Sequence, residues 1–292
     1  MNKIKDKLIF FFFLLSGLIV VMLLAGIFYL LGSTSIHAFK EISLKQFFFS
    51  DNWNPNAYGE PSYGIVSMIV STFMVTIGSL VIAVPLGIGT AAYLSDIASE
   101  KVREIVKPVI EILAAIPSVV IGFLGIVLIG PIVAKIFHIQ SGLNAVNGSI
   151  LLAVMALPTI ISLSEDALTA VPNTYTEASL ALGATKWQTL VKVKIPAALS
   201  GILASCMLGM GRAVGETMTV LMATGCAPAM PHSFLDSVRT LTSSIAIELG
   251  EVAYFSTHYY ALFAVGLVLF IITFIINLAS DIILHNYQKV YN

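Results

Sequence analysis

The chain has 292 residues, of which 58% are hydrophobic and only 11% are charged, and its mean hydropathy is +0.94. Soluble domains carry about 45–50% apolar and ~25% charged residues, so this composition excludes an ordinary soluble protein. The formal net charge of −1 says little by itself, because the distribution of basic residues between loops matters more in a membrane protein than their sum.

A membrane-spanning helix needs about 20 predominantly apolar residues. Six stretches meet or approach that length: Leu8–Leu31, Gly64–Leu94, Pro108–Ala134, Ser149–Leu163, Ala197–Ala223 and His258–Leu284. The fourth is the shortest, and we expect its helix to continue through Glu165 and Asp166 as it leaves the membrane. The sequence therefore predicts an all-α integral membrane fold with six transmembrane helices, surrounded by membrane lipid.

The first apolar stretch has an alternative interpretation as a cleaved signal peptide, because Lys3, Lys5 and Lys7 precede it. Signal peptides have an apolar region of about 7–15 residues followed by a small-residue cleavage site. This stretch is longer, and no clear cleavage site follows it. We therefore expect it to remain as a membrane helix.

The basic residues of the loops predict the orientation. Ten lysines and arginines lie before span one, between spans two and three, between spans four and five, or after span six. Only four lie in the other loops: Lys40, Lys45, Lys135 and Arg239. Because cytoplasmic loops carry the excess of basic residues, both termini are expected in the cytoplasm.

This orientation divides the chain into four segments. Residues 1–35 form a basic start and the first helix, 36–63 an extracytoplasmic loop, 64–285 the main membrane domain and 286–292 a cytoplasmic tail. The first outer loop contains Trp53, Asn54 and Pro55. It is compatible with an interfacial belt and a short re-entrant element, or with a docking surface for a partner outside the membrane.

The cytoplasmic loop 171–196 carries the densest set of local signals. Thr174 and Glu177 have the spacing of a capping box, Gly183 suits the left-handed end of a helix, and Thr185 with Gln188 offers a second box. Pro196 then leads into span five. These features predict a helix–glycine–helix hairpin at the cytoplasmic surface, where small side chains permit close approach of another body. An ordinary amphipathic connector would show similar features.

The same loop resembles a known family. Glu177-Ala178-Ser179, three residues, Gly183, nine residues and then Val193-Lys194-Ile195-Pro196 resemble the E-A-A-x3-G-x9-I-x-L-P motif of ABC importer permeases. Ser179, Val193 and Ile195 depart conservatively from it. The resemblance implies a type I ABC importer permease fold, with this segment as the coupling helix that sits in a cleft of an ATP-binding subunit.

Two ionisable residues, Arg212 and Glu216, lie inside the fifth apolar stretch. If the stretch is one helix, they lie on the same face four residues apart and can pair, beside Gly211 and Gly215, whose small-xxx-small spacing allows close helix packing. A structural ion pair between helices is one interpretation. The other places Arg212 in a translocation path for an anion, because charges inside the membrane are usually functional and a guanidinium suits oxyanions.

The segment Gly211–Met218 is similar to the G-R-A-x-G-E-T segment of phosphate importer permeases, and is closer to the PstC type than to the PstA type. Further similarities lie in Ala83–Gly87, in Ala114–Gly122 and in Asp51–Pro55. The resemblance implies import of inorganic phosphate into the cytoplasm. Arg212, Glu216, Thr217 and Ser118 are the candidate residues of the path, although the two hydroxyl groups could equally serve helix packing.

The sequence has no G-x-x-x-x-G-K-[ST] motif and no long soluble segment. We therefore expect no catalytic residue, metal site or bound cofactor in this chain, with ATP and Mg on a separate subunit. The resemblance implies a PstA-like permease partner, two PstB-like ATP-binding subunits, an extracytoplasmic phosphate-binding protein and a bacterial plasma membrane, and we expect no nucleic-acid partner.

Three alternatives remain. A sulfate or molybdate permease would use an arginine equally well. An ion-coupled secondary transporter or channel explains the spans but not the loop motif. An intramembrane enzyme would need a nucleophile–base pair or a metal set, whereas the five histidines lie in loops or near span edges.

Overall fold

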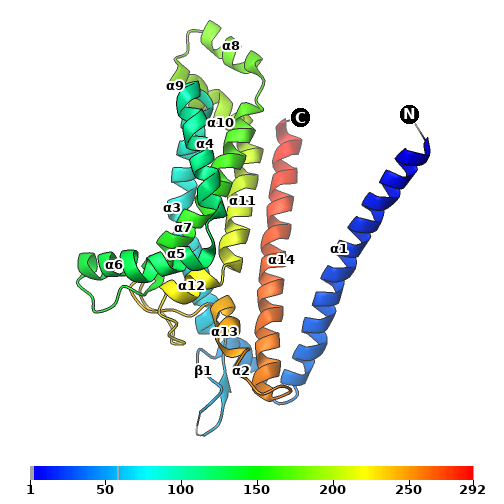
Figure 1. The fold of residues 1–292 in the computed structure, drawn as a ribbon, viewed down its shortest axis with the longest axis vertical. Helices are drawn as coiled ribbons and strands as arrows, with labels where there is room; N and C mark the ends of the chain where they lie inside the picture. The colour runs from blue at the N-terminus through cyan, green and yellow to red at the C-terminus, as the bar shows by residue number, and fades with distance from the viewer. Residues whose placement is uncertain (1–2, 58, 292) are drawn as a thin grey trace.

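The computed structural model describes the backbone of residues 3–57 and 59–291, and this part of the chain is mostly helical (Figure 1). The long helices are α1 (Lys3–Ala38), α3 (Val66–Asp96), α7 (Ala145–Thr169), α11 (Leu199–Gly215) and α14 (Thr257–Tyr291). The shorter ones are α2 (Leu44–Phe49), α4 (Glu100–Ala115), α5 (Ser118–Leu124), α6 (Gly130–Phe137), α8 (Asn173–Ala181), α9 (Lys186–Thr189), α10 (Ile195–Ala197), α12 (Met218–Ala223) and α13 (Leu241–Glu248). Two π-helical turns, η1 (Gly125–Ile129) and η2 (Leu190–Lys194), and a hairpin of β1 (Trp53–Asn54) and β2 (Ser62–Tyr63) complete the described elements.

The number of membrane crossings agrees with the sequence. Within the described residues, five helical runs are long and apolar enough to cross a membrane, and the bent pair Lys186–Ala197 and Leu199–Gly215 makes a sixth. The two parts of this pair meet at 70°, close to Pro196. The all-α membrane fold with six spans is therefore confirmed.

Helix α7 is the most enclosed span, and it packs along α3 and α11. It runs to Thr169, so the predicted continuation past Glu165 and Asp166 is confirmed. Glycines set the spacing of α3 and α7: a Cβ on Gly87 would lie 2.6 Å from Ile160 Cγ2. Close helix approach through small residues is how membrane helices gain packing contacts without a hydrophobic driving force between them.

The third span differs from the prediction of one helix over Pro108–Ala134. Helix α4 ends at Ala115, Ile116 is extended with ψ 127°, and α5 begins at Ser118. Pro117 causes the break, because proline lacks an N–H and forces the preceding residue away from helical dihedrals. The apolar run that remains is Ser118–Phe137, and Figure 1 shows α5 and α6 running across the end of the bundle at a steep angle to α4.

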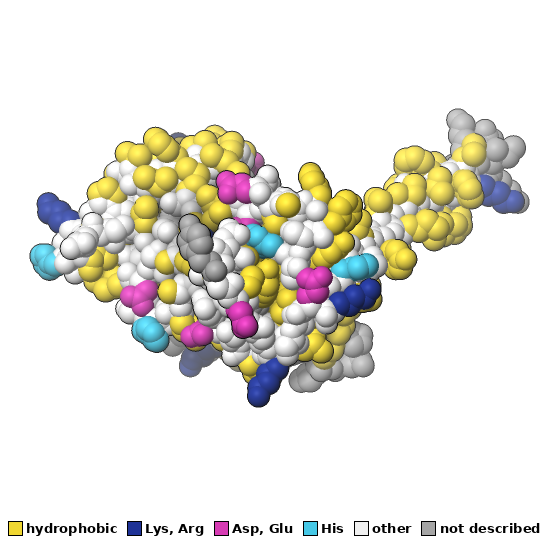
Figure 2. Space-filling view, turned by 90° about the horizontal axis from the view of Figure 1, so that it is seen from below, with side chains coloured by type: hydrophobic (Ala, Val, Ile, Leu, Met, Phe, Trp, Pro, Cys, Tyr) yellow, Lys and Arg dark blue, Asp and Glu magenta, His cyan; other side chains and the backbone are white. Residues whose placement is uncertain are grey.

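Helix α1 packs on α14, and its residues 7–30 are exposed. Figure 2, viewed from the end opposite α8, shows it projecting from the body as a largely hydrophobic arm. Its last residue, Ala38, joins Phe47 of α2, Trp53 of the hairpin and Leu262 of α14 in a buried apolar cluster. The predicted loop 36–63 therefore contains α2 and the β1–β2 hairpin, held against the ends of α1 and α14.

Candidate translocation and coupling sites

The fifth span breaks at the residues that were predicted to line a path. Helix α11 ends at Gly215, Glu216 is extended with ψ 132°, and α12 starts at Met218. The prediction that Arg212 and Glu216 lie one turn apart on the same helix is therefore wrong. At this turn, Thr242 at the start of α13 donates a hydrogen bond of 2.9 Å to the Glu216 carbonyl, which satisfies a backbone group outside the helix.

The breaks of the third and fifth spans meet each other. The Thr219 hydroxyl of α12 lies 3.1 Å from the Ser118 carbonyl at the start of α5, and 3.5 Å from Glu216 Oε1, and it can donate to one of them at a time. Thr219 is fully buried, whereas Ser118 and Glu216 are half-buried. Ser118, Glu216 and Thr219 therefore form one polar junction, which we call the break junction.

Glycine allows this junction to close. A Cβ on Gly122 of α5 would lie 2.9 Å from Met222 Sδ and 3.2 Å from Thr219 Cα of α12. Beneath it, the buried Asn147 donates through Nδ2 to the carbonyls of Gly125 and Ala223, at 3.0 and 3.1 Å. Irregular backbone at membrane depth needs such partners, because no water replaces the missing helical bonds.

Arg212 lies one turn before this junction and points elsewhere. Its side chain is exposed, as are Leu208 and Gly215 on the same face of α11, and among the described residues it makes no ion pair. The predicted Arg212–Glu216 ion pair is therefore not formed. Thr217 is half-buried and donates to the Gly215 carbonyl at 3.4 Å.

The two candidate packing glycines differ in their surroundings. A Cβ on Gly211 would lie 3.5 Å from Asn277 Oδ1, so Gly211 faces α14, whereas nothing lies within 4 Å of a Cβ on Gly215. Closer packing contacts come from Gly209, whose Cβ would lie 2.8 Å from Ile160 Cγ1. Gly209 lies two residues before Gly211, and its packing role was not predicted.

The loop 171–196 forms the predicted hairpin of two short helices, α8 and α9, with Gly183 at φ +84° between them. The second capping box is present: Gln188 N donates to Thr185 Oγ1 and Thr185 N donates to Gln188 Oε1. The first box is wrong, because α8 already starts at Asn173 after Pro172, which places Thr174 inside the helix. Pro172, directly before the first turn, sets the start of α8, so Thr174 is not the capping residue.

This hairpin stands at one end of the molecule, and both ends of the described chain lie towards the same end (Figure 1). Glu177, Ala178 and Gly183 are exposed, Ser179 and Pro196 are half-buried, and Leu182 is 90% exposed. The Ser179 hydroxyl lies 2.9 Å from Thr189 Oγ1, which ties α8 to α9. The hairpin is therefore an exposed and internally braced platform.

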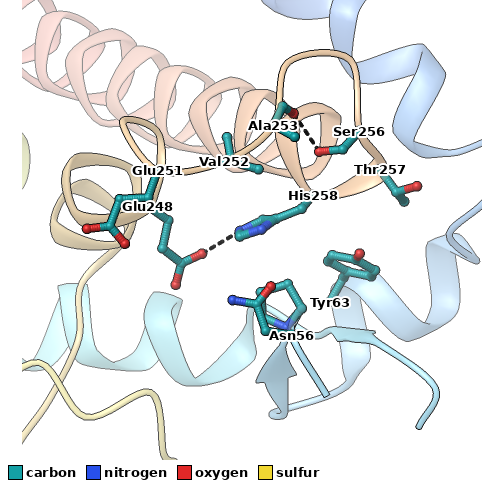
Figure 3. Close-up of a pocket in the computed structure, with 10 residues that line it drawn as sticks. Asn56, Tyr63, Glu248, Glu251, Val252, Ala253, Ser256, Thr257 and His258 are labelled. Atoms are coloured by element: carbon teal, nitrogen blue, oxygen red, sulfur yellow. Dashed lines mark hydrogen bonds and ion pairs between the residues drawn. The ribbon is translucent and has the colours of Figure 1, made fainter. Parts of the chain in front are cut away.

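The opposite end holds a largely buried polar group centred on Glu248 of α13, which we call the outer cluster after the orientation that the loop charges predict. Its carboxylate accepts hydrogen bonds from Trp53 Nε1 (2.9 Å) and Arg239 Nη1 (2.6 Å), and His258 Nε2 lies 2.7 Å away. Beside it lies a pocket of about 430 Å³, whose wall includes Tyr63 and Thr257 (Figure 3). The outer cluster holds the β1–β2 hairpin, α13 and α14 together.

The electrostatics of the outer cluster favour the charged carboxylate. Burial by itself would raise the pKa of Glu248, but hydrogen bonds from His258 and Trp53 and the charges of His258 and Arg239 hold that pKa below its ordinary value. Because α13 also carries Thr242, the short helix connects the break junction with the outer cluster.

The residues missed by sequence reasoning are Thr219, Thr242 and Glu248. Thr240 and Ser243 form a capping box at the start of α13, a signal that could have located this helix. No local pattern indicates that Glu248 meets Trp53, because the two residues are 195 positions apart.

Comparison with solved structures defines the class of fold. A chain of a bacterial alginate ABC transporter, solved in complex with an alginate-bound periplasmic protein, matches with a TM-score of 0.66 and 14% identity over 98% of this chain and 96% of that chain. The arrangement of helices is therefore that of an ABC importer permease.

Sequence comparison then places the chain in a family. Residues 83–289 match the family model described as binding-protein-dependent transport system inner membrane component, and the chain belongs to this family. A probable ABC transporter permease protein, YqgH, of Bacillus subtilis is 41% identical over 80% of this chain and 75% of its own length. The phosphate transport system permease protein PstC of Pasteurella multocida is 32% identical over 83% of this chain and 80% of its own length.

Proposed function

We propose that this chain is a PstC-type permease subunit that moves inorganic phosphate into the cytoplasm, driven by ATP hydrolysis on a separate subunit. The observation that carries the proposal is an exposed arginine, Arg212, on an apolar membrane helix beside two broken spans. The phosphate permeases among its relatives supply the substrate: PstC of Pasteurella multocida is 32% identical over 83% of this chain.

The position of Arg212 has a physical consequence. An unpaired charge facing lipid costs at least about 2.5–3.5 kcal/mol, so the uncovered face of α11 must meet either another protein chain or an aqueous path. A guanidinium holds oxyanions through a planar fork of N–H groups and stays charged at any physiological pH. We assign Arg212 to the path, together with Glu216 and Ser118 of the break junction and Thr217, which follows Glu216 in the chain.

The break junction is better suited to passage of an anion than to its tight binding. Glu216 places a carboxylate near the route of the anion, and a site that binds too strongly cannot release what it carries. The Thr219 hydroxyl lies 3.1 Å from the Ser118 carbonyl, 3.0 Å from Met155 Sδ and 3.5 Å from Glu216 Oε1, so it has more than one acceptor within reach. These features support a path that opens where the two helices break.

The platform formed by α8 and α9 supports the coupling role. Glu177, Ala178, Ser179 and Gly183 lie on its exposed or half-exposed surface, and Pro196 precedes the 70° bend into α11. Movement of a subunit bound to α8 can therefore be transmitted to α11 through the short segment between them. ATP and Mg bind to that separate subunit, because this chain has no phosphate-binding loop motif.

The resemblance to phosphate importer permeases supports the assembly that we propose. A PstA-like permease covers the Arg212 face as a heterodimeric partner, two PstB-like subunits bind ATP in the cytoplasm, and a phosphate-binding protein docks outside. The ten-to-four excess of basic residues supports a multi-pass bacterial plasma membrane protein with both termini in the cytoplasm. The placement of both chain ends towards the α8 end agrees with this orientation (Figure 1).

Labelled phosphate uptake tests the function directly. Cells lacking this chain should lose high-affinity uptake, and uptake in wild-type cells should survive excess sulfate or molybdate but not ATP depletion. Loss of sulfate uptake with phosphate uptake unchanged would assign a different oxyanion. Uptake that persists on an ion gradient alone, without the ATP-binding subunit, would instead identify a secondary transporter.

A further inference from the structure

One lysine of the segment that follows α9 is buried. Lys194, the last residue of η2, has a side chain only 9% exposed, and its Nζ lies 2.5 Å from Asp96 Oδ1. Asp96 is the last residue of α3, on a different span. Lys192, two residues earlier on the same turn, is exposed. The pair thus joins the loop 171–196 to the cytoplasmic end of α3.

Each member of this pair depends on the other. A carboxylate at the C-terminal end of a helix is unfavourable, because the helix dipole places partial negative charge there. Ser95 Oγ donates to the other oxygen of Asp96 at 3.0 Å, which leaves Oδ1 for the lysine. A buried charge whose partner is removed is strongly unfavourable. Lys194 and Asp96 therefore stay together when the loop moves.

The end of α3 is also fastened to the core. Arg103 of α4 donates from Nη2 to the carbonyls of Leu94 and Ser95, at 2.6 and 2.9 Å, and its Nε lies 3.6 Å from Glu165 Oε1. Glu165 belongs to α7 and is buried, and it also pairs with Lys107 at 2.7 Å. A chain of ionic and hydrogen-bond contacts therefore runs from Lys194 through the end of α3 to α7.

The α8–α9 platform is linked to this chain of contacts through η2, which ends at Lys194. The Ser179–Thr189 hydrogen bond and the Thr185–Gln188 capping box make α8, α9 and η2 one braced unit. Leu190 adds apolar contact with Leu168 and Ala91, but apolar contacts are non-directional and permit sliding. The ion pair is the contact that fixes the register between the platform and α3.

We propose that Lys194 and Asp96 are positioning residues that transmit movement of the α8–α9 platform to α3 and α7, a role that rests on the proposed function of this chain. They touch neither ATP nor the transported anion. Without the pair, the platform can still dock on the ATP-binding subunit, but its displacement is no longer passed to the spans.

The test measures phosphate transported per ATP hydrolysed. The complete transporter, with its permease partner, ATP-binding subunits and binding protein, is reconstituted in liposomes with Asp96→Asn, Lys194→Met or the reversed pair Asp96→Lys with Lys194→Asp. We expect each single variant to assemble and hydrolyse ATP, while the ratio falls about tenfold, and the reversed pair to recover most of it. Lys192→Met, an exposed neighbour, should leave the ratio unchanged.

A wild-type ratio in Lys194→Met would overturn the inference. Failure of the nearly isosteric Asp96→Asn complex to assemble would also overturn it, because the pair would then serve assembly and not transmission. A reversed pair that assembles with the low ratio of the single variants would count against it as well. If the wild-type complex hydrolyses ATP but moves no phosphate, the proposed function fails, whatever the variants do.

Discussion

At the scale of single residues, Arg212 places a positive charge on a membrane span, where it needs a polar or protein environment. Its neighbours on the exposed face of α11, Leu208 and Gly215, offer it no hydrogen bond, so its environment must come from the assembled transporter. Glu216 lies beyond the end of the helix and faces the break junction instead. We therefore assign attraction of the anion to Arg212 and its release to Glu216 at the break junction.

Replacing Arg212 by alanine should therefore strongly reduce transport without preventing assembly. Charge-assisted hydrogen bonds are worth about 1.5–3 kcal/mol, so we expect labelled phosphate uptake to fall roughly 10- to 100-fold. Arg212→Lys, which keeps the charge but loses the planar fork, should be intermediate. Leu208→Ala, on the same exposed face, is the matched control. Near wild-type uptake in Arg212→Ala would show that the arginine is structural.

The outer cluster predicts a pH dependence of stability. The folded-state pKa of Glu248 is lowered, so folding favours its charged form. Its contribution is fully present above the ordinary carboxylate pKa of about 4.3 and is lost as the pH falls through the lower folded pKa. Glu248→Gln should lower the thermal midpoint of the purified protein at pH 7 by roughly 2–5 °C.

Acidification should reduce this difference between wild type and variant. The measurement is the midpoint of thermal unfolding in detergent from pH 7 down to about 3.5, around the ordinary carboxylate pKa. Glu251→Gln, at an exposed residue of the same pocket, is the control and should change little. A difference that grows as the pH falls would contradict the assignment of a charged, hydrogen-bonded Glu248.

At the scale of elements, two spans are broken and the breaks pack together. Pro117 explains the first, and the hydrogen bond from Thr242 to the Glu216 carbonyl stabilises the second. Breaks in membrane helices are tolerated only where the freed backbone groups find partners or line a cavity. At the break junction the hydroxyl groups of Thr242 and Thr219 supply such partners, to the carbonyls of Glu216 and Ser118.

The platform depends on one left-handed residue, Gly183, at φ +84°. A side chain in this conformation costs about 1–2 kcal/mol, and a β-branched one costs more. Gly183→Val should reorient α8 and weaken co-purification of the ATP-binding subunit about tenfold.

Gly183→Asn is the matched variant, because asparagine tolerates the left-handed region and should retain binding. If valine and asparagine weaken co-purification equally, the side chain itself and not the backbone conformation is responsible. If neither weakens it, α8 is not the docking element.

At the scale of the whole molecule, the outer cluster and the platform occupy opposite ends of the helical body, with the break junction between them (Figure 1). Helix α13 links the junction to the outer cluster, and η2 links the platform to α3. The described contacts therefore connect the outer cluster with the break junction, and the platform with α3 and α7.

Thiol labelling tests the orientation of the whole chain. In a background with Cys206 and Cys226 replaced by alanine, Asn56→Cys should react with a membrane-impermeant maleimide in intact cells. Lys101→Cys at the start of α4 should react only after permeabilisation. Both positions are exposed, so the difference reports which side of the membrane each occupies. The opposite pattern would invert the proposed topology.

Features that depend only on neighbours along the chain could be predicted from the sequence. Apolar length fixed the number of spans, the Thr185–Gln188 box and Gly183 fixed the hairpin, and the loop motif identified the family. These properties are local because a cap, a left-handed turn or a membrane-spanning length involves only nearby residues.

Tertiary structure decided what the charged and polar side chains do. The Arg212–Glu216 pair was expected from helical spacing, but packing of α13 at Glu216 and of α12 on α5 ends the helix first. The contacts Trp53–Glu248, Asp96–Lys194 and Ser118–Thr219 join residues far apart in the chain. Their formation depends on how whole helices pack, and no local pattern carries that information.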